Sequence, residues 1–195
     1  MNQQIVNTKE SILITALQVF AEKGYEASSV ADIAGKLGLG KSALYKHYKN
    51  KRDILDSILS RMEDIDRAFK EEHPYKSAEG QIDFKALECY VFAHFCRWTE
   101  DEFGASFRKL LTLEQFSSDE MARLYRHYLT EGPVFELTDV FSSFGGSRAA
   151  AMGMAMYLYS PLYLYYSMYD SADERRIVVG AAKAHVHRFM TQLQV

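Results

Sequence analysis

The stretch GLGKSALYKHYKNKRDIL, residues 38–55, places two glycines, two tyrosines, one histidine and five cations within eighteen residues. The glycines at 38 and 40 break the chain, and a short segment from about Lys41 to Tyr48 follows them. A helix this short is not stable by itself in water. It therefore needs an apolar side that packs on neighbouring helices, and its remaining surface is available for another role.

Helical geometry separates the two sides of this segment. At about 100° per residue, Leu44 and Tyr48 fall on one face. The opposite face carries hydroxyl and amino groups: Ser42, Tyr45, Lys46 and Lys49. We therefore expect Leu44 and Tyr48 to anchor the helix in a core, with its polar groups facing outward.

A second short helix is predicted just before the glycines, in SSVADIAGKLG. Ser29 and Asp32 stand three residues apart, which is the spacing of a capping box at a helix N-terminus. The apolar stripe of this helix comprises Val30, Ile33, Ala34 and Leu37. Two short helices joined by a tight glycine-containing turn predict a helix-turn-helix, whose second helix enters the major groove of DNA.

The charge distribution agrees with a polyanion-binding N-terminal end. The helix after this segment begins with Lys51 and Arg52, at an N-terminus whose dipole favours phosphate. Residues 1–61 hold 9 Lys and Arg against 6 Asp and Glu, whereas residues 62–195 hold 14 against 20. A basic segment on an acidic remainder favours nucleic acid as the partner. The alternative is a solvated helical hairpin whose lysines only maintain solubility.

The stretch from Thr8 to Leu55 resembles the N-terminal domain of TetR-family transcriptional regulators. ALQVFAEKGYEASSV is similar to the start of that domain, and IAGKLGLGKSALYKHYKNKRDIL to its recognition segment. The pairs Leu44-Tyr45 and His47-Tyr48, followed by Lys51, fall where the family keeps Leu-Tyr, His-aromatic and Lys. The resemblance covers about a quarter of the chain and favours the DNA-binding interpretation over the solvated hairpin.

The resemblance implies a set of DNA-binding residues. The implied phosphate contacts are Ser29, Tyr45, His47 and Lys51, and the implied contacts to base edges are Lys41, Ser42, Ala43 and Lys46. Tyrosine and serine hydroxyls are common phosphate donors, and a lysine can donate to guanine. Two positions depart from the family: Gly40 stands where a Ser or Thr often caps the helix, and Ala31 lacks the long polar side chain of some members. Sequence specificity is therefore expected to depend mainly on the helix that begins at Lys41.

The rest of the chain shows helical periodicity throughout. We predict an all-α fold, with a three-helix helix-turn-helix DNA-binding domain in residues 1–50 and a larger helical bundle for effector binding and dimerisation in residues 51–195. The connecting helix is expected to cover about 51–69. Further helices are predicted near 82–99, 103–116, 118–130, 133–143, 149–168 and 172–193.

In the family, the C-terminal body dimerises and holds a small-molecule pocket. The small and aromatic side chains of SRAAAMGMAMYLYSPLYLYYSMYD, together with RRIVVGAAKAHVHRFM, predict helices that pair between two subunits. Aromatic side chains are the candidates for lining an effector site. The predicted effector-binding residues are Phe92, Phe95, Trp98, Phe107, Tyr163 and Tyr166. The alternative for both sets is ordinary core packing within one chain.

Several other functions are disfavoured by the residues. The uncharged run 149–169 has the length of a membrane span, but Pro161 and its many tyrosines favour a buried helix at a subunit contact, so no membrane association is expected. Cys89 and Cys96 make neither a disulfide framework nor a zinc site, as expected in a reducing cytoplasm. His185 and His187 point about 200° apart on a helix and cannot chelate together. We therefore expect no catalytic residues, no metal, no cofactor and no enzymatic activity.

These observations lead to one functional prediction. The chain is expected to be a ligand-responsive transcriptional regulator that binds a palindromic site in double-stranded DNA as a homodimer. Repression, the usual mode of the family, is expected, with release by a small apolar or aromatic effector that is not identified. The alternative is a helical adaptor that binds another protein and not DNA.

Overall fold

The computed structural model describes residues 8–193, which form α-helices and no strand beyond an isolated bridge between Lys76 and Ile82. This confirms the all-α prediction. The described residues divide into two compact units: one runs up to Ala68 and includes Ser106–Ala122, and the other comprises Phe69–Ala105 and the chain from Arg123 on. The domain boundary predicted at residue 50 remains a prediction.

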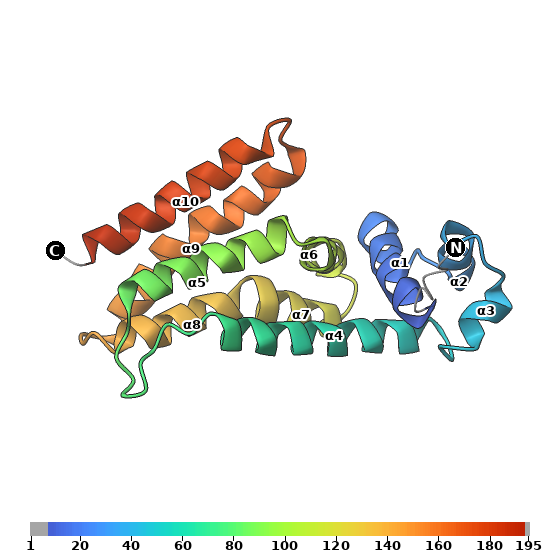
Figure 1. The fold of residues 1–195 in the computed structure, drawn as a ribbon, viewed down its shortest axis with the longest axis horizontal. Coiled ribbons are helices and arrows are strands. Elements are labelled where there is room, and N and C mark those ends of the chain that lie inside the picture. The colour runs from blue at the N-terminus through green and yellow to red at the C-terminus, as the bar shows by residue number, and fades with distance from the viewer. Residues whose placement is uncertain (1–7, 194–195) are drawn as a thin grey trace, which may run out of the picture. The chain divides into compact units, whose positions relative to one another are not determined.

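The first unit contains the helix-turn-helix region (Figure 1). Its helices are α1 (Thr8–Lys23), α2 (Val30–Lys36), α3 (Lys41–Tyr45), most of α4 (Lys51–Glu72), most of α6 (Glu102–Glu114) and the start of α7 (Asp119–Leu129). Its core is formed by fully buried aliphatic and aromatic side chains: Ile12, Ala16, Leu17, Phe20, Ile33, Leu44, Ile54, Leu55 and Ile58. Burial of these faces, rather than intrinsic helix propensity, holds the short helices in place.

Helix α3 is one turn shorter than the sequence predicts, and the polar pattern of the next residues explains why. The N–H groups of His47 and Tyr48 both donate to the Leu44 carbonyl, at 2.9 and 3.0 Å, so the helix closes in a tight turn. The chain then leaves the helix because Asn50 caps α4. The Asn50 side chain accepts from the Asp53 N–H at 2.9 Å, and the Asp53 carboxylate accepts from the Lys49 N–H at 2.8 Å.

The second unit is built from α5 (Phe84–Thr99), α8 (Glu131–Ser142), α9 (Arg148–Ser171) and α10 (Arg175–Gln192), with the adjoining ends of α4, α6 and α7. Helix α9 packs along α8, and α10 packs against both α9 and α5 (Figure 1). The predicted C-terminal helices are thus all present. None of the helices within 8–193 combines the length and apolarity that a membrane span requires.

Two prolines lie within these helices. Pro133 is in the first turn of α8, where the N–H that proline lacks has no helical partner. The neighbouring Gly132 is required because a Cβ there would lie 1.8 Å from the His127 carbonyl oxygen. Pro161 lies inside α9, and the ring of His185 on α10 is 2.9 Å from the Leu158 carbonyl oxygen just before it. A side chain of α10 thus contacts the main chain of α9 in the turn before the proline.

Candidate nucleic-acid interface

Helix α3 is anchored as its pattern predicts. Leu44 and Tyr48 are 1% and 3% exposed, and the Tyr48 hydroxyl donates to the Lys9 carbonyl at 3.1 Å. Burial raises the pKa of Tyr48 to about 12, and the nearby carboxylates of Glu10 and Asp53 add to this effect. The neutral phenol is therefore strongly favoured, and it fastens the turn that follows α3 to α1.

The opposite side of α3 faces outward. Tyr45 is 53% exposed. Four other predicted DNA contacts of this segment are exposed as well: Lys41, Ser42, Lys46 and His47. Ala43 is half-buried. Gly40 is the N-cap of α3 and provides no side-chain cap, in agreement with its departure from the family pattern. The structure thus brings a tyrosine hydroxyl, amines, a serine hydroxyl and a methyl group together on one short helix.

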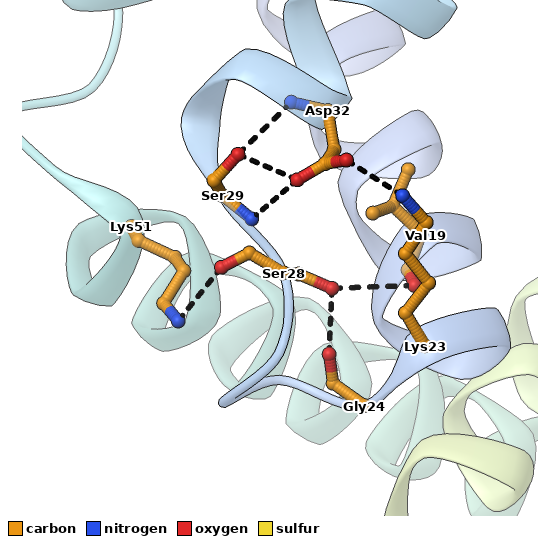
Figure 2. Close-up of polar contacts among 7 residues, drawn as sticks. All are labelled: Val19, Lys23, Gly24, Ser28, Ser29, Asp32 and Lys51. Atoms are coloured by element: carbon orange, nitrogen blue, oxygen red, sulfur yellow. Dashed lines mark hydrogen bonds and ion pairs between the residues drawn. The ribbon is translucent and has the colours of Figure 1, made fainter.

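Helix α2 begins in the capping box that Ser29 and Asp32 predict (Figure 2). The Ser29 hydroxyl oxygen accepts from the Asp32 N–H at 3.2 Å, and the Asp32 carboxylate accepts from the Ser29 N–H at 2.9 Å. The same carboxylate binds the Lys23 ammonium at 2.6 Å. The contacts with Lys23 and then Ser29 hold the pKa of Asp32 far below its usual value. Ser29 is exposed, but its hydroxyl donates to the Asp32 carboxylate at 2.5 Å, so its predicted phosphate contact would have to replace that bond.

Lys51 has an internal role that sequence reasoning missed. Its ammonium donates to the carbonyl oxygens of Tyr25, Glu26 and Ser28, at 2.7, 3.3 and 3.0 Å. It also lies 4.2 Å from the centre of the Tyr25 ring, which is within reach of a cation–π contact. Figure 2 shows Lys51 reaching from α4 to Ser28 in the loop before α2. Its predicted phosphate contact remains a prediction, and it would have to coexist with these bonds.

Arg52 is held by acidic side chains. Its guanidinium forms a two-bond fork with the Glu120 carboxylate, at 2.6 and 2.7 Å, and its Nε donates to Asp56 at 2.7 Å. The hydrogen bond to Glu120 is the main reason why the pKa of Arg52 is raised. Glu120 lies on α7, some seventy residues further along the chain, and only the folded structure shows that it lies beside Arg52.

The predicted effector-binding aromatics occupy different surroundings. Phe107 belongs to the first unit, and the other five belong to the second. Phe95 and Trp98 are fully buried, and Phe95 stacks on Tyr166 with 5.5 Å between ring centres. Phe92 is half-buried with the Lys183 ammonium 5.6 Å from its ring centre, and Tyr163 is 38% exposed. Their role in effector binding remains a prediction.

One groove in the second unit is large enough for a small molecule. It lies between α8 and α9, has a volume of about 400 Å³, and contains Tyr163 alone among the predicted effector residues. It is lined by Thr130, Glu131, Val134, Phe135, Met152, Met156, Tyr159, Ser160 and Tyr163. The methionines and Phe135 make it mainly apolar, and the Tyr163 hydroxyl is in contact with that of Tyr125. Sequence reasoning missed the methionines because they also suit an ordinary helix face.

These features define a helix-turn-helix protein with a second, all-helical unit, and comparisons with known proteins specify it further. Residues 12–58 match the family described as bacterial regulatory proteins, tetR family. The chain is 40% identical to the HTH-type transcriptional repressor BepR of Brucella suis biovar 1 over a stretch of 58 residues. This stretch covers 30% of this chain and 28% of BepR. In general, the chain matches only about a quarter of the length of its curated relatives.

Solved structures match over nearly the whole chain. A TetR-family transcriptional regulator from Marinobacter aquaeolei VT8 has a TM-score of 0.66 and 17% identity over 94% of this chain and 88% of its own. The regulator FadR from Bacillus subtilis, in complex with stearoyl-CoA, has a TM-score of 0.61 and 20% identity over 93% and 97%. At these identities the likeness shows the fold.

Residues 12–58 therefore match the N-terminal domain of the TetR family, and the described chain has the fold of TetR-family regulators of known structure. The curated relatives compared above are named as transcriptional regulators.

Proposed function

We propose that the protein is a transcriptional repressor that binds a palindromic DNA site as a homodimer and leaves it when a small apolar effector binds. The observation that carries this proposal is α3: it is fixed by the buried Leu44 and Tyr48 and exposes Tyr45, Lys41 and Ser42 on its other side. A helix presented in this way matches the geometry of a recognition helix in the major groove.

The proposed division of labour follows from the two-part chain. Residues 1–50, together with Lys51 at the start of α4, bind DNA: Ser29, Tyr45, His47 and Lys51 contact phosphates, and Lys41, Ser42, Ala43 and Lys46 face base edges. Residues 51–195 dimerise and bind the effector. Phosphate contacts fix the position of the protein on the duplex, whereas base contacts select the sequence.

The homodimer is supported by an apolar face on α9. Large apolar side chains of this helix outside the groove remain exposed in the single chain: Tyr157, Leu164 and Met168. Leu164 is 59% and Tyr157 is 64% exposed. A contiguous apolar face of this kind marks a protein contact. A second copy that covers it would bring two recognition helices to half-sites about one helical turn, or a multiple of it, apart.

The effector is proposed to be a small apolar molecule that binds in the α8–α9 groove. The groove has the volume of a small-ligand site and few polar groups. The FadR structure in complex with stearoyl-CoA supports an apolar part in the effector, because the stearoyl chain of that ligand is apolar. An effector releases DNA only by its differential affinity for the two states of the dimer.

Selection of bound duplexes from a random DNA pool tests the proposed function. We expect the wild-type chain to enrich an inverted repeat and to bind it less tightly as salt rises, because phosphate neutralisation releases counterions. An enriched sequence without internal symmetry would contradict the dimer. Failure to retain any duplex, together with capture of a protein partner through the same surface, would favour the adaptor alternative.

A further inference from the structure

Glu114, the last residue of α6, is buried against the loop that joins α1 to α2. Glu114 is only 5% exposed. Its Oε1 accepts the main-chain N–H of Tyr25 at 2.6 Å and lies 3.4 Å from the N–H of Glu26. A glutamate is seldom this buried unless its oxygens are bound, and a bond to a carboxylate is stronger than one between neutral groups. The contact joins residues 89 apart in the sequence.

Gly24 makes room for this carboxylate. A Cβ at Gly24 would lie 2.6 Å from Oε1 of Glu114, so the carboxylate would have to move away from the loop. Gly24 also has a φ of +86°, a conformation that side chains disfavour, and its N–H ends α1 by donating to Phe20. A glycine at this position therefore allows α1 to end there and allows the Glu114 carboxylate to approach the loop.

The same loop is bound from its other polar side by Lys51. Glu114 binds the N–H groups of Tyr25 and Glu26, whereas Lys51 binds their carbonyl oxygens and that of Ser28. The loop's main chain is therefore fixed by one side chain from α6 and one from α4, and neither helix belongs to the helix-turn-helix pair. The loop ends at Ser29, the N-cap of α2.

We propose that Glu114 is a positioning residue for DNA binding. By holding the N–H groups of Tyr25 and Glu26, it sets where α2 begins, and α3 follows α2 through a short turn. The end of α6 thereby determines the orientation in which the outward face of α3 is presented. This inference rests on the proposed function, because its main readout is binding of a duplex.

The test uses the full chain and a duplex selected from a random pool by the wild type. Glu114→Ala removes the acceptor, Glu114→Asp withdraws the carboxylate by one methylene, and Glu114→Gln keeps an oxygen that can accept the same N–H groups. Ile58→Val is the matched control, because it perturbs a fully buried residue of the same unit and removes no hydrogen-bonding group. Amide hydrogen exchange at Tyr25 and Glu26 reports the contact directly, without DNA.

We expect Glu114→Ala and Glu114→Asp to exchange these two amides faster and to bind the duplex about tenfold more weakly at equal folded fraction, since loss of about 1.4 kcal/mol is tenfold in affinity. Glu114→Gln should bind within about threefold of the wild type, and Ile58→Val should bind like it. If Glu114→Ala does not fold, Glu114→Asp carries the same expectation.

Three results would overturn the inference, each in a different way. Faster amide exchange in a folded Glu114 variant that binds the duplex as well as Ile58→Val would show a role in stability alone. Unchanged amide exchange at Tyr25 and Glu26 in the Glu114 variants would show that Glu114 does not bind these N–H groups. A wild type that retains no duplex would overturn the proposed function and this inference together, and it is recognised because it fails before any variant is made.

Discussion

The ammonium of Lys51 lies 3.0 Å from the carbonyl oxygen of Ser28, the residue directly before the N-cap of α2. A side chain that the sequence assigns to a phosphate thus also holds the loop on which the DNA-binding helices depend. A bond from a charged donor to a main-chain carbonyl contributes more than a neutral one. The position therefore couples the fold of the first unit to its proposed function.

Lys51→Met tests this coupling, because it keeps the apolar stem and removes only the charge and its donors. We expect the free energy of unfolding to fall by about 1–2 kcal/mol without DNA, since three carbonyl oxygens lose their shared donor. Urea unfolding measures this change. Lys46→Met is the matched control, because it removes the same charge from an exposed residue. Equal stabilities of the two variants would mean that Lys51 acts only through DNA.

Tyr45→Phe and Lys41→Ala separate a phosphate contact, which positions the protein on DNA, from a base contact, which selects the sequence. Tyr45→Phe removes one exposed hydroxyl, and we expect it to weaken binding to all duplexes by a similar factor, because a phosphate contact carries no sequence information. Lys41→Ala should change which base is preferred at one position, by about 1–3 kcal/mol. Binding to single-base variants of the selected duplex measures both effects. If both variants keep the wild-type affinity and preference, α3 is not the recognition helix.

The local features of the fold were predictable because neighbouring residues determine them. The Ser29–Asp32 capping box, the end of α1 at Gly24 and the buried pair Leu44 and Tyr48 all depend on short spacings that a sequence shows directly. The contacts made by Glu114 and Glu120 join residues 89 and 68 apart, and no periodicity reports such a contact. The early end of α3 was also not predicted from the sequence, because it depends on Asn50 capping the next helix.

Glu120→Gln is expected to strengthen DNA binding through Arg52. The guanidinium of Arg52 is now engaged by Glu120 and Asp56 at the start of α4. Loss of the Glu120 charge makes Arg52 available to a phosphate, so the affinity for any duplex should rise and the slope of log K against log salt should steepen by about one. Stability should change little, because exposed ion pairs contribute about 0–1 kcal/mol. The same substitution with Arg52→Gln present should have no effect, and a gain there would refute the explanation.

The stability that the capping box contributes should fall in acid. In the folded protein the pKa of Asp32 lies far below its ordinary value of 3.8, chiefly through Lys23 and then Ser29. A depressed folded-state pKa contributes stability that is complete above the unfolded pKa and is lost as the pH falls. We therefore expect the difference in unfolding free energy between the wild type and Asp32→Asn to be constant above about pH 5 and to shrink below about pH 4. Urea unfolding at several pH values measures it. Asp173→Asn, an exposed carboxylate in the second unit, is the control, and a difference that stays constant down to pH 3 would contradict the role of Asp32.

Leu164→Glu is expected to separate the proposed dimer. Leu164 is 59% exposed in the single chain and lies on the apolar face of α9, so a charge there would be buried against a second copy without a partner. We expect sedimentation velocity at micromolar concentration to show a wild-type dimer and a Leu164→Glu monomer of unchanged helix content. Phe116→Glu is the matched control, because Phe116 is 91% exposed but lies in the first unit. The monomer should also lose most of its affinity for the inverted repeat, since two linked recognition helices bind far more tightly than one. A wild type that sediments as a monomer, or a Leu164→Glu dimer, would show that α9 is not the contact between copies.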